Sequence, residues 1–325
     1  MNREPVRFSF GHLPDPPDSR DFKLKISPQT VLVPTDLRSQ MRPIKNQGNL
    51  GACTAFATTA MVEFVRSKQR MIEWDASPLF TYYSSRKIEG TIPIDSGAYV
   101  RDALKSTVKD GVVKEESWPY IVENFAMLPP SAVWVEAETH QTLTYSKVDQ
   151  TQEGVLGCLS EGYPFTFGAK LFDSFIKTQT GMFVTNTVPM PNLSADKYVG
   201  GHCMLAVGYT SASDTSIEII VRNSWSEYVG IDGYHFMPIE YILDPTLSMD
   251  FWTIRTEEYA QEDILQDPVI PPAPTPEPVI PPEPAPVPTP EPVIPPVPVK
   301  KSMWKDPITY VVILFVLLLL SFVLL

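Results

Sequence analysis

The sequence predicts an α+β fold in which two lobes face each other across a cleft. Helical periodicity prevails in the first half of the chain, whereas short apolar strands prevail in the second half. A content of 43% hydrophobic residues, with 11% aromatic residues, is typical of a globular protein. Because the expected helices precede the strands, we expect each lobe to form one wall of the cleft.

Helices are predicted in three segments and short strands in four. Apolar residues recur at helical spacing from Cys53 onward, so the first helix is predicted to be buried and to begin at that residue. The second helix has Ser77 followed by Pro as its start signal, and the third ends before Gly111. The predicted helices cover residues 53–68, 77–86 and 99–109, and the predicted strands cover 163–170, 203–209, 217–221 and 233–237.

Composition divides the chain into four segments. Residues 1–34 are expected to be an extended lead segment with one short strand, because their prolines prevent a helix. Residues 35–262 are the expected globular domain. Residues 263–306 are a Pro-rich stalk containing two copies of TPEPVIPP, for which we expect a semi-rigid polyproline spacer. A ligand for a proline-recognising domain is the alternative interpretation of this stalk.

Residues 307–325 are almost entirely apolar and long enough to span a bilayer core. Lys300, Lys301 and Lys305 lie before this stretch, so the positive-inside rule predicts that the globular domain faces the cytosol. The sequence thus predicts a single-pass tail anchor with the lipid bilayer as a partner.

Charge and cysteine content narrow the class of protein further. The formal net charge of −12 gives no counterion-release energy on a phosphate backbone, which argues against nucleic acid as a partner. The three cysteines do not make a disulfide framework, and the N-terminus lacks the apolar region of a secretory signal. Both observations favour a reducing compartment.

Four residues form a candidate constellation for nucleophilic catalysis. A cysteine attacks a carbonyl carbon efficiently as thiolate, so its pKa must be lowered by a helix N-terminus and a neighbouring imidazolium. Cys53 lies at the predicted start of a helix, and His202 is the candidate base. Asn223 is placed to orient that histidine, and Gln47 is a candidate donor to an oxyanion.

Three segments resemble the papain-like cysteine peptidases. NQGNLGACTAFA at 46–57 is similar to the nucleophile segment of that family, GGHCMLAVGY at 200–209 to its histidine segment, and VRNSWSEYVGIDGYHF at 221–236 to its asparagine segment. The order Gln, Cys, His, Asn is the family's order, and the resemblance covers roughly residues 11–255. It implies a helical lobe with the nucleophile helix and an antiparallel β-barrel-like lobe.

The resemblance also assigns roles. It implies that Cys53 is the nucleophile, His202 the base, Asn223 its orienter and Gln47 the oxyanion donor, while Trp225 shields the histidine–asparagine hydrogen bond from water. The segment DSGAY resembles the one whose glycine backbone pairs with the substrate main chain, which is Gly97 in this sequence.

Two shorter features refine the resemblance. LPDPPDSRDF at 13–22 resembles a microbial and viral branch without a long inhibitory propeptide. The layout with a C-terminal anchor is similar to that of membrane-anchored cysteine proteinases of large DNA viruses such as iridoviruses.

The expected activity is therefore hydrolysis of peptide bonds in a protein or peptide substrate, without a cofactor or metal. Alone, Cys53 is readily explained as a small buried residue and His202 as a core histidine; together with Gln47 and Asn223 they favour catalysis. One alternative is a catalytically inactive papain-fold binding module, because Thr54 differs from the residue usual after the nucleophile. Another is transfer of the acyl group to an amine, or removal of a conjugated modifier.

Overall fold

The computed structural model describes residues 8–180, 187–211 and 217–258. The chain divides into two units, residues 1–269 and 270–325, and all described residues belong to the first unit. Its elements are, in chain order, β1 (His12–Leu13), β2 (Thr35–Asp36), η1 (Arg38–Gln40), α1 (Cys53–Lys68), α2 (Pro78–Glu89), β3 (Ala98–Tyr99), α3 (Val100–Lys109), η2 (Val122–Asn124), α4 (Ser131–Ala137), β4 (Thr142–Lys147), α5 (Gln152–Ser160), β5 (Phe165–Phe172), α6 (Asp173–Thr180), β6 (Tyr198–Tyr209), β7 (Glu218–Arg222), β8 (Tyr234–Pro238), α7 (Ile239–Leu243) and β9 (Ser248–Glu257).

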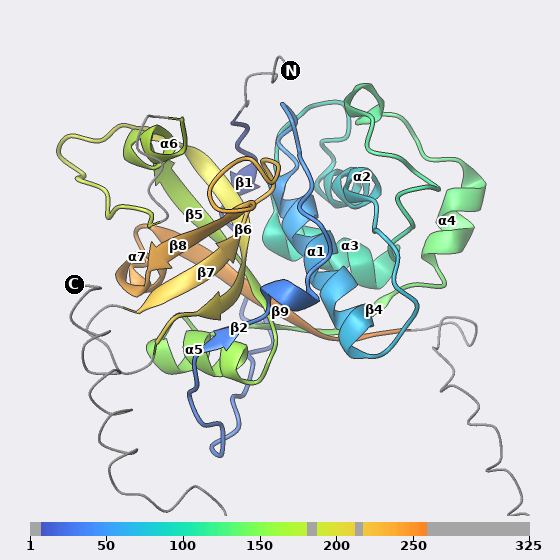
Figure 1. Cartoon of the computed structure of the whole chain (residues 1–325). Helices are drawn as coiled ribbons and strands as arrows, with labels where there is room; N and C mark the ends of the chain where they lie inside the picture. The colour runs from blue at the N-terminus through green and yellow to red at the C-terminus, as the bar shows by residue number, and fades with distance from the viewer. Residues whose placement is uncertain (1–7, 181–186, 212–216, 259–325) are drawn as a thin grey trace, which may run out of the picture. The chain divides into compact units, whose positions relative to one another are not determined.

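Seven strands form one antiparallel sheet, and the helices α1 to α4 lie to one side of it (Figure 1). The strand order is β4-β9-β5-β6-β7-β8, and β2 pairs with β6 outside this path. Within the described residues the end strands β4 and β8 do not pair, so the expected barrel-like lobe is an open sheet. The α+β class and the separation into a helical side and a sheet side agree with the sequence prediction.

Helix α1 lies between the sheet and the other helices. Every residue from Cys53 to Arg66 is buried, because the helix packs against β6 and β9 on one side and against α2 and α3 on the other. Toward the sheet, Phe64 joins a core with Leu205 and Trp252. The predicted single apolar stripe is thus apolar nearly all round, as expected for a central helix. This packing fixes the N-terminus of α1 between the two lobes.

The predicted start of the second helix is confirmed by its capping contacts. Ser77 is the N-cap of α2, and its side chain accepts a hydrogen bond from the Phe80 backbone N–H at 3.1 Å. Pro78 follows at the first helical position, where its missing N–H costs nothing. The helix ends at Gly90, which has the left-handed backbone conformation usual after a helix.

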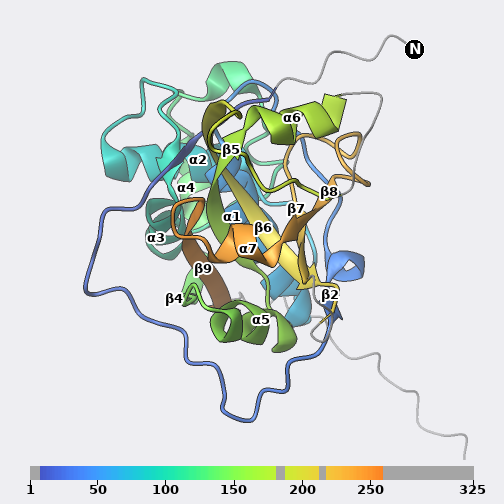
Figure 2. The ribbon, with the colours of Figure 1, turned by 90° about the vertical axis from the view of Figure 1, so that its left-hand side faces the viewer.

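Residues 14–34 run around the outside of the molecule, as the blue trace in Figure 2 shows. Leu24 donates its backbone N–H to the Lys147 carbonyl at the end of β4. Farther on, the backbone N–H of Val33 reaches the hydroxyl of Ser160 at the end of α5. The lead segment is extended, as predicted, and contains the two-residue strand β1 before this outer path.

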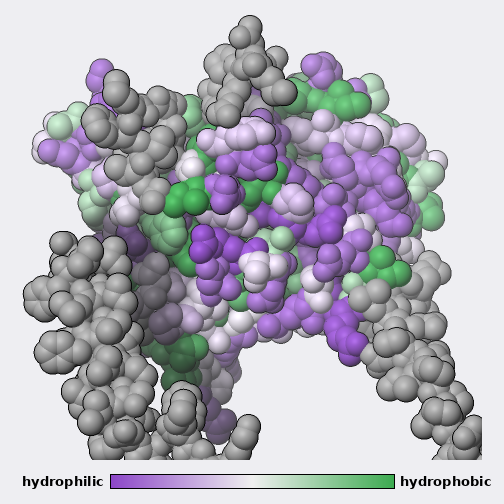
Figure 3. All heavy atoms as spheres, in the orientation of Figure 1, coloured by the Kyte–Doolittle hydropathy of each residue, from purple (hydrophilic) through white to green (hydrophobic). Residues whose placement is uncertain are grey.

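The face of the molecule shown in Figure 3 is largely hydrophilic, with hydrophobic residues scattered over it. Large exposed hydrophobic side chains are spread along the described sequence from Phe22 to Tyr228. Isolated residues of this kind are normal on a soluble domain and do not by themselves mark an interaction surface.

The predicted membrane anchor and its cytosolic-facing localisation require correction. Among the helices of the described residues, none combines the length and the apolar character needed to cross a bilayer. The predicted stalk at 263–306 and the predicted anchor at 307–325 lie outside the described residues. The tail-anchored localisation is therefore withdrawn, and the Pro-rich segment keeps only its sequence-based interpretation.

A buried carboxyl at the end of β9 predicts a pH dependence of stability. Burial raises the pKa of Glu257 from its usual 4.5 to about 8, although the Thr142 hydroxyl donates to this carboxyl at 2.6 Å. Between these two pH values the folded protein holds a proton that the unfolded chain releases, so stability falls as pH rises, by at most about 1.4 kcal/mol per pH unit. Glu257→Gln should flatten this slope in denaturant unfolding measured at pH 5 and pH 8; identical slopes for wild type and variant would contradict the assignment.

Candidate active site

Cys53 is the first residue of α1 and its side chain is fully buried. The preceding residue, Ala52, has no side chain that could cap the helix, so the first backbone N–H groups remain available to the sulfur. The Cys53 thiol accepts a hydrogen bond from the backbone N–H of Cys203 at 3.3 Å. A helix N-terminus and converging amide donors are the setting that stabilises a thiolate.

His202 and Asn223 meet on the sheet side of the cleft. His202 lies on β6, and its Nε2 donates to Asn223 Oδ1 at 2.8 Å. The same oxygen accepts from the Ser224 backbone N–H at 2.7 Å, and Asn223 Nδ2 donates to His235 Nε2 at 3.0 Å. Because Asn223 occupies Nε2, His202 Nδ1 is left as the free ring nitrogen, and it is buried without a hydrogen-bond partner among the described residues.

The Trp225 indole covers the His202 ring. Their centroids are 4.2 Å apart and their planes differ by 19°, which is a stacked arrangement. Trp225 is fully buried. The hydrogen bond from His202 to Asn223 is therefore packed under an apolar ring, where a hydrogen bond is stronger than in water.

Gln47 is held in one orientation by Ser224. The Ser224 hydroxyl donates to Gln47 Oε1 at 2.5 Å, so the Nε2 group of the same amide points the other way. The Gln47 backbone N–H also donates to the Ser224 carbonyl at 2.8 Å, and Asn46 pairs with Trp225 in an isolated antiparallel bridge. This pairing connects the loop before α1 to the loop after β7.

Residues 8–13, called the covering segment below, lie across these side chains. Gln47 Nε2 donates to the Ser9 carbonyl oxygen at 3.3 Å, as well as to the Leu50 carbonyl at 2.9 Å. Phe8 packs edge-on against Trp225 at 4.8 Å between ring centroids, and Phe10 is 6.3 Å from the His202 ring. The covering segment thus occupies the place where a peptide would approach Cys53.

Gly97 and Gly11 let the covering segment come close to the helical wall. The Ala98 backbone N–H donates to the Gly11 carbonyl at 2.8 Å, and β1 pairs with β3 in parallel. Gly97 has φ +75°, and a Cβ there would be 2.2 Å from the Gly11 oxygen. A Cβ at Gly11 would in turn lie 1.8 Å from the Gly51 carbonyl oxygen. The contact therefore requires glycine at both positions.

Burial beneath the covering segment keeps both reactive groups neutral. Desolvation raises the pKa of Cys53 to about 11, while backbone N–H groups, including those of Cys203 and Gly11, act in the opposite direction. Desolvation lowers the pKa of His202 to about 3, against the hydrogen bond to Asn223. A thiol and a neutral imidazole are thus expected at neutral pH while the cleft is covered.

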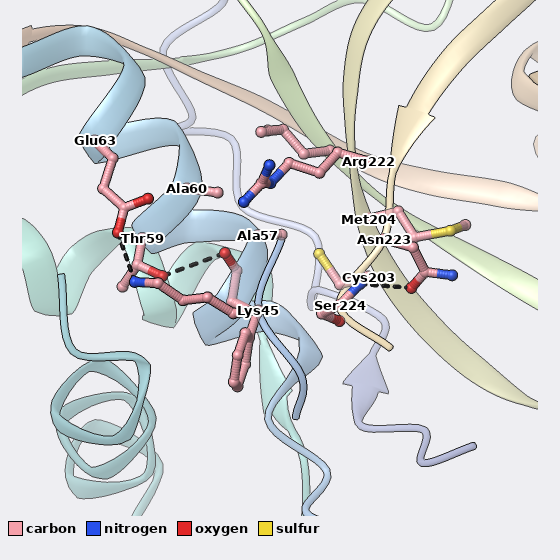
Figure 4. A pocket seen from close by; sticks show the side chains of 12 residues that line it. Lys45, Ala57, Thr59, Ala60, Glu63, Cys203, Met204, Arg222, Asn223 and Ser224 are labelled. Carbon is pink, nitrogen blue, oxygen red and sulfur yellow. Dashed lines mark hydrogen bonds and ion pairs between the residues drawn. The ribbon is translucent and has the colours of Figure 1, made fainter. Parts of the chain in front are cut away.

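A small cavity lies behind the site, between α1 and the strands β6 and β7 (Figure 4). Cys203, Asn223 and Ser224 line one side of it, and Lys45 and Glu63, which form an ion pair at 2.7 Å, line the other. Its volume of about 10 Å³ is enough for at most one water molecule. A peptide cannot bind in this cavity.

The structure brings together all the residues that the sequence predicted for the site. Contacts join His202 to Asn223 and Trp225, and Gln47 is joined to the loop of Asn223 through Ser224. Cys53 contacts the backbone N–H of Cys203, the residue after His202, and Gly97 contacts the main chain of the covering segment. Cys158 and Cys203 are buried free cysteines.

Sequence reasoning missed Ser224, which orients Gln47, and His235, which accepts from Asn223. It also missed that the lead segment enters the cleft. Ser224 belongs to the motif already noticed, whereas the only available signal for the covering segment was the isolated Gly11 in a Pro-rich stretch.

Comparisons with known proteins agree with this geometry. The family description "Papain family cysteine protease" matches residues 33–241. An uncharacterized peptidase C1-like protein of Acanthamoeba polyphaga mimivirus is 33% identical over 286 residues, which cover 78% of this chain and 89% of that protein. The chain belongs to the papain family of cysteine proteases.

Solved structures show the same fold. Xylellain, a cysteine protease from Xylella fastidiosa, superposes with a TM-score of 0.70 at 34% identity, covering 76% of this chain and 96% of that one. Digestive procathepsin L 3 of Tenebrio molitor larval midgut gives a TM-score of 0.55 at 19% identity, covering 73% and 75% of the two chains. The second likeness concerns the fold alone.

A single substitution should uncover Cys53 in the full-length chain. In Gly11→Val the side chain would collide with the Gly51 carbonyl, and Gly51 is held in place because its N–H donates to Asp95 at 3.0 Å. The covering segment must then leave, and we expect the thiol to react with a maleimide about 10 to 100 times faster at pH 7.

Ser9→Ala is the matched control, because Ser9 contacts Gln47 through its backbone carbonyl, which this change retains. Mass spectrometry of peptides assigns the labelled cysteine, since Cys158 and Cys203 are also free. Equal labelling of Cys53 in wild type and Gly11→Val would show that the covering segment does not protect the thiol in solution.

Proposed function

We propose that this protein is a cysteine endopeptidase that hydrolyses peptide bonds through a thioester on Cys53. The observation that carries the proposal is the contact between Gln47 Nε2 and the Ser9 carbonyl oxygen at 3.3 Å. The amide of Gln47 thereby holds a peptide carbonyl of the covering segment. In the same segment, the Gly11 backbone N–H donates a hydrogen bond to the Cys53 sulfur. The contact imitates the recognition of a substrate carbonyl at an oxyanion site.

The first half-reaction forms the acyl-enzyme. His202 Nδ1 takes the proton of the Cys53 thiol, and the resulting thiolate attacks the carbonyl carbon of the scissile bond. A carbon–sulfur bond forms while the carbonyl oxygen takes up negative charge. Gln47 Nε2 and the Cys53 backbone N–H stabilise that oxygen. When the intermediate collapses, the carbon–nitrogen bond breaks and protonated His202 gives its Nδ1 proton to the leaving amine.

The second half-reaction restores the enzyme. His202 accepts a proton from water, the resulting hydroxide attacks the thioester carbon, and the carbon–sulfur bond breaks to release the carboxylic acid. Protonated His202 then returns its proton to the Cys53 thiolate, which restores the thiol. Asn223 keeps Nε2 occupied, so that Nδ1 is the nitrogen that exchanges protons. Trp225 shields this hydrogen bond from water, and Gly97 lets a substrate main chain approach the helical wall.

An endopeptidase is favoured because the cleft holds an interior stretch of polypeptide. The chain continues beyond the covering segment on the C-terminal side, where Asp15 and Pro16 contact Arg101 on α3. A cleft that accepts a continuous chain suits cleavage within a substrate. The covered conformation corresponds to an inactive form, and we infer that activity requires the covering segment to leave.

The proposal is tested with a thiol-directed epoxide of the papain-inhibitor class on the full-length Gly11→Val chain. Cys53→Ala in that background should abolish labelling, and His202→Ala should slow it about 100-fold or more, because the thiolate loses its imidazolium partner. Circular dichroism and thermal unfolding confirm that each variant is folded. A folded Gly11→Val chain whose Cys53 reacts no faster than Cys158 or Cys203 would instead indicate an inactive papain-fold module.

Gln47→Ala separates oxyanion stabilisation from thiol activation. Alkylation by an epoxide forms no oxyanion on a carbonyl, so labelling of Cys53 should change by less than about threefold, whereas hydrolysis of a fluorogenic peptide should fall about 100- to 1,000-fold in kcat. Ser224→Ala, which removes the hydroxyl that orients Gln47, should give a smaller loss with the same pattern. A parallel loss of labelling and hydrolysis in Gln47→Ala would contradict the assigned role.

A further inference from the structure

One side chain of the covering segment fills a pocket of its own. His12 is buried, and its Nε2 lies 2.8 Å from Asp250 Oδ2 at the bottom of that pocket. Gly168 on β5 and Gly201 on β6 form the walls: a Cβ at Gly168 would be 2.1 Å from His12 Nε2, and a Cβ at Gly201 would be 2.7 Å from the His12 carbonyl oxygen. The pocket therefore exists because two neighbouring strands lack side chains at these positions.

The carboxylate is aimed into the pocket by an irregularity of β9. Between β5 and β9 the register changes from Thr166 opposite Trp252 to Gly168 opposite Met249, so β9 has one extra residue there. Asp250 lies in this bulge with φ +58°, a left-handed conformation that short polar residues tolerate. Bulges of this kind redirect a side chain out of the regular alternation of a strand.

The Asp250 carboxylate depends on donors that belong to the lead segment. Its Oδ2 accepts from His12 Nε2 and from the Asp15 backbone N–H at 3.0 Å, and Asp250 is only 8% exposed. His12 leaves together with the covering segment, whereas Asp15 lies beyond it, where its carboxylate accepts from the Arg101 backbone N–H and from Trp252 Nε1. Arg101, the cation of α3 packed on this side, is engaged by Asp21 at 2.8 Å and by the Pro16 carbonyl. A largely buried carboxylate that loses one of its donors is destabilised, so an uncovered pocket favours a ligand that brings a positive charge.

We propose that Asp250 makes this pocket the specificity site of the enzyme and that it selects substrates with a basic side chain, Arg, Lys or His. His12 is the intramolecular stand-in for that substrate residue. His12, which fills the pocket, directly follows Gly11 in the chain. Gly11 contacts Gly97, and its backbone N–H donates to the Cys53 sulfur. A side chain bound in this pocket therefore belongs to a peptide that lies in the cleft. This inference rests on the proposed peptidase function, but the binding of the side chain can be measured without turnover.

The first experiment measures binding alone. The full-length chain carries Gly11→Val to empty the cleft and Cys53→Ala to prevent turnover. Synthetic peptides with the sequence of residues 8–16 carry His12, His12→Arg, His12→Gln or His12→Leu. We expect the Arg peptide to bind at least about tenfold more tightly than the Gln and Leu peptides in calorimetry or fluorescence anisotropy, because it brings a charged donor to Asp250. The His peptide should bind more tightly than the Leu peptide, because its ring N–H donates to the carboxylate.

Asp250→Asn in the same chain should remove the preference, leaving less than about a threefold difference between the Arg and Leu peptides. Asn keeps the shape of the side chain and tolerates the left-handed backbone, so the fold is retained. Asp36→Asn is the matched control: it removes one carboxylate from the surface pair with Arg38, away from the pocket, and should leave the preference unchanged. Equal binding of all four peptides, or a preference that survives Asp250→Asn, would overturn the inference.

The second experiment uses Gly11→Val with Cys53 intact and a fluorogenic peptide library. We expect one substrate position to prefer Arg or Lys by about tenfold or more in kcat/KM; Asp250→Asn should abolish that preference, whereas the control Asp36→Asn should retain it. Hydrolysis without a preference for a basic residue at any substrate position would refute the proposed role of Asp250 but not the proposed peptidase function. If Cys53 failed to react in the folded chain, the proposed peptidase function would be refuted. The peptide-binding experiment would still decide whether Asp250 selects a basic side chain.

Discussion

The site depends on a short main-chain pairing between the loop before α1 and the loop after β7. The Gln47 N–H bonds to the Ser224 carbonyl, and Asn46 forms a bridge with Trp225. Gln47, the proposed oxyanion donor, and the loop that carries Asn223 and Trp225 are thereby fixed to each other through backbone atoms. Ser224 adds a side-chain bond to Gln47, so a shift of one loop would be transmitted to the other. Geometry within a fraction of an ångström is what acyl transfer requires, and rigid backbone pairing provides it.

The burial that orders the candidate site also favours the uncharged forms of Cys53 and His202. In the covered conformation the thiol and the imidazole lie in a dry environment that disfavours their charged forms, and desolvation outweighs the helix N-terminus and the amide donors. Once the cleft is hydrated, those donors and the neighbouring ring act on a solvated sulfur. The covered and the open cleft thus share one arrangement of side chains, and they differ in whether Cys53 and His202 contact water.

The parts of the fold that sequence reasoning predicted well are those with local signals. The start of α1 at Cys53 and the Ser77 cap of α2 are encoded by neighbouring residues, and the predicted boundaries lie within a few residues of those observed. The motifs around Cys53, His202 and Asn223 are local signals too, and from them the candidate site was predicted. By contrast, β9 was missed because its residues are buried and bulged rather than alternating, and Asp250 could be recognised only after the register of β5 and β9 was known. The position of the covering segment depends on contacts between residues far apart in the sequence, which no local pattern encodes.

Because its occupant belongs to the same chain, the cleft experiences that occupant at an effective concentration of the order of millimolar. If the covering segment bound as a separate peptide with a dissociation constant of ~10 μM, the cleft would be open in about 1% of molecules, and every external ligand would bind about 100-fold more weakly than its intrinsic affinity. Inhibitor potencies measured on the intact chain would then report the covering equilibrium as much as the fit of the inhibitor. A weak ligand of the intact protein would therefore be a strong ligand of its open form.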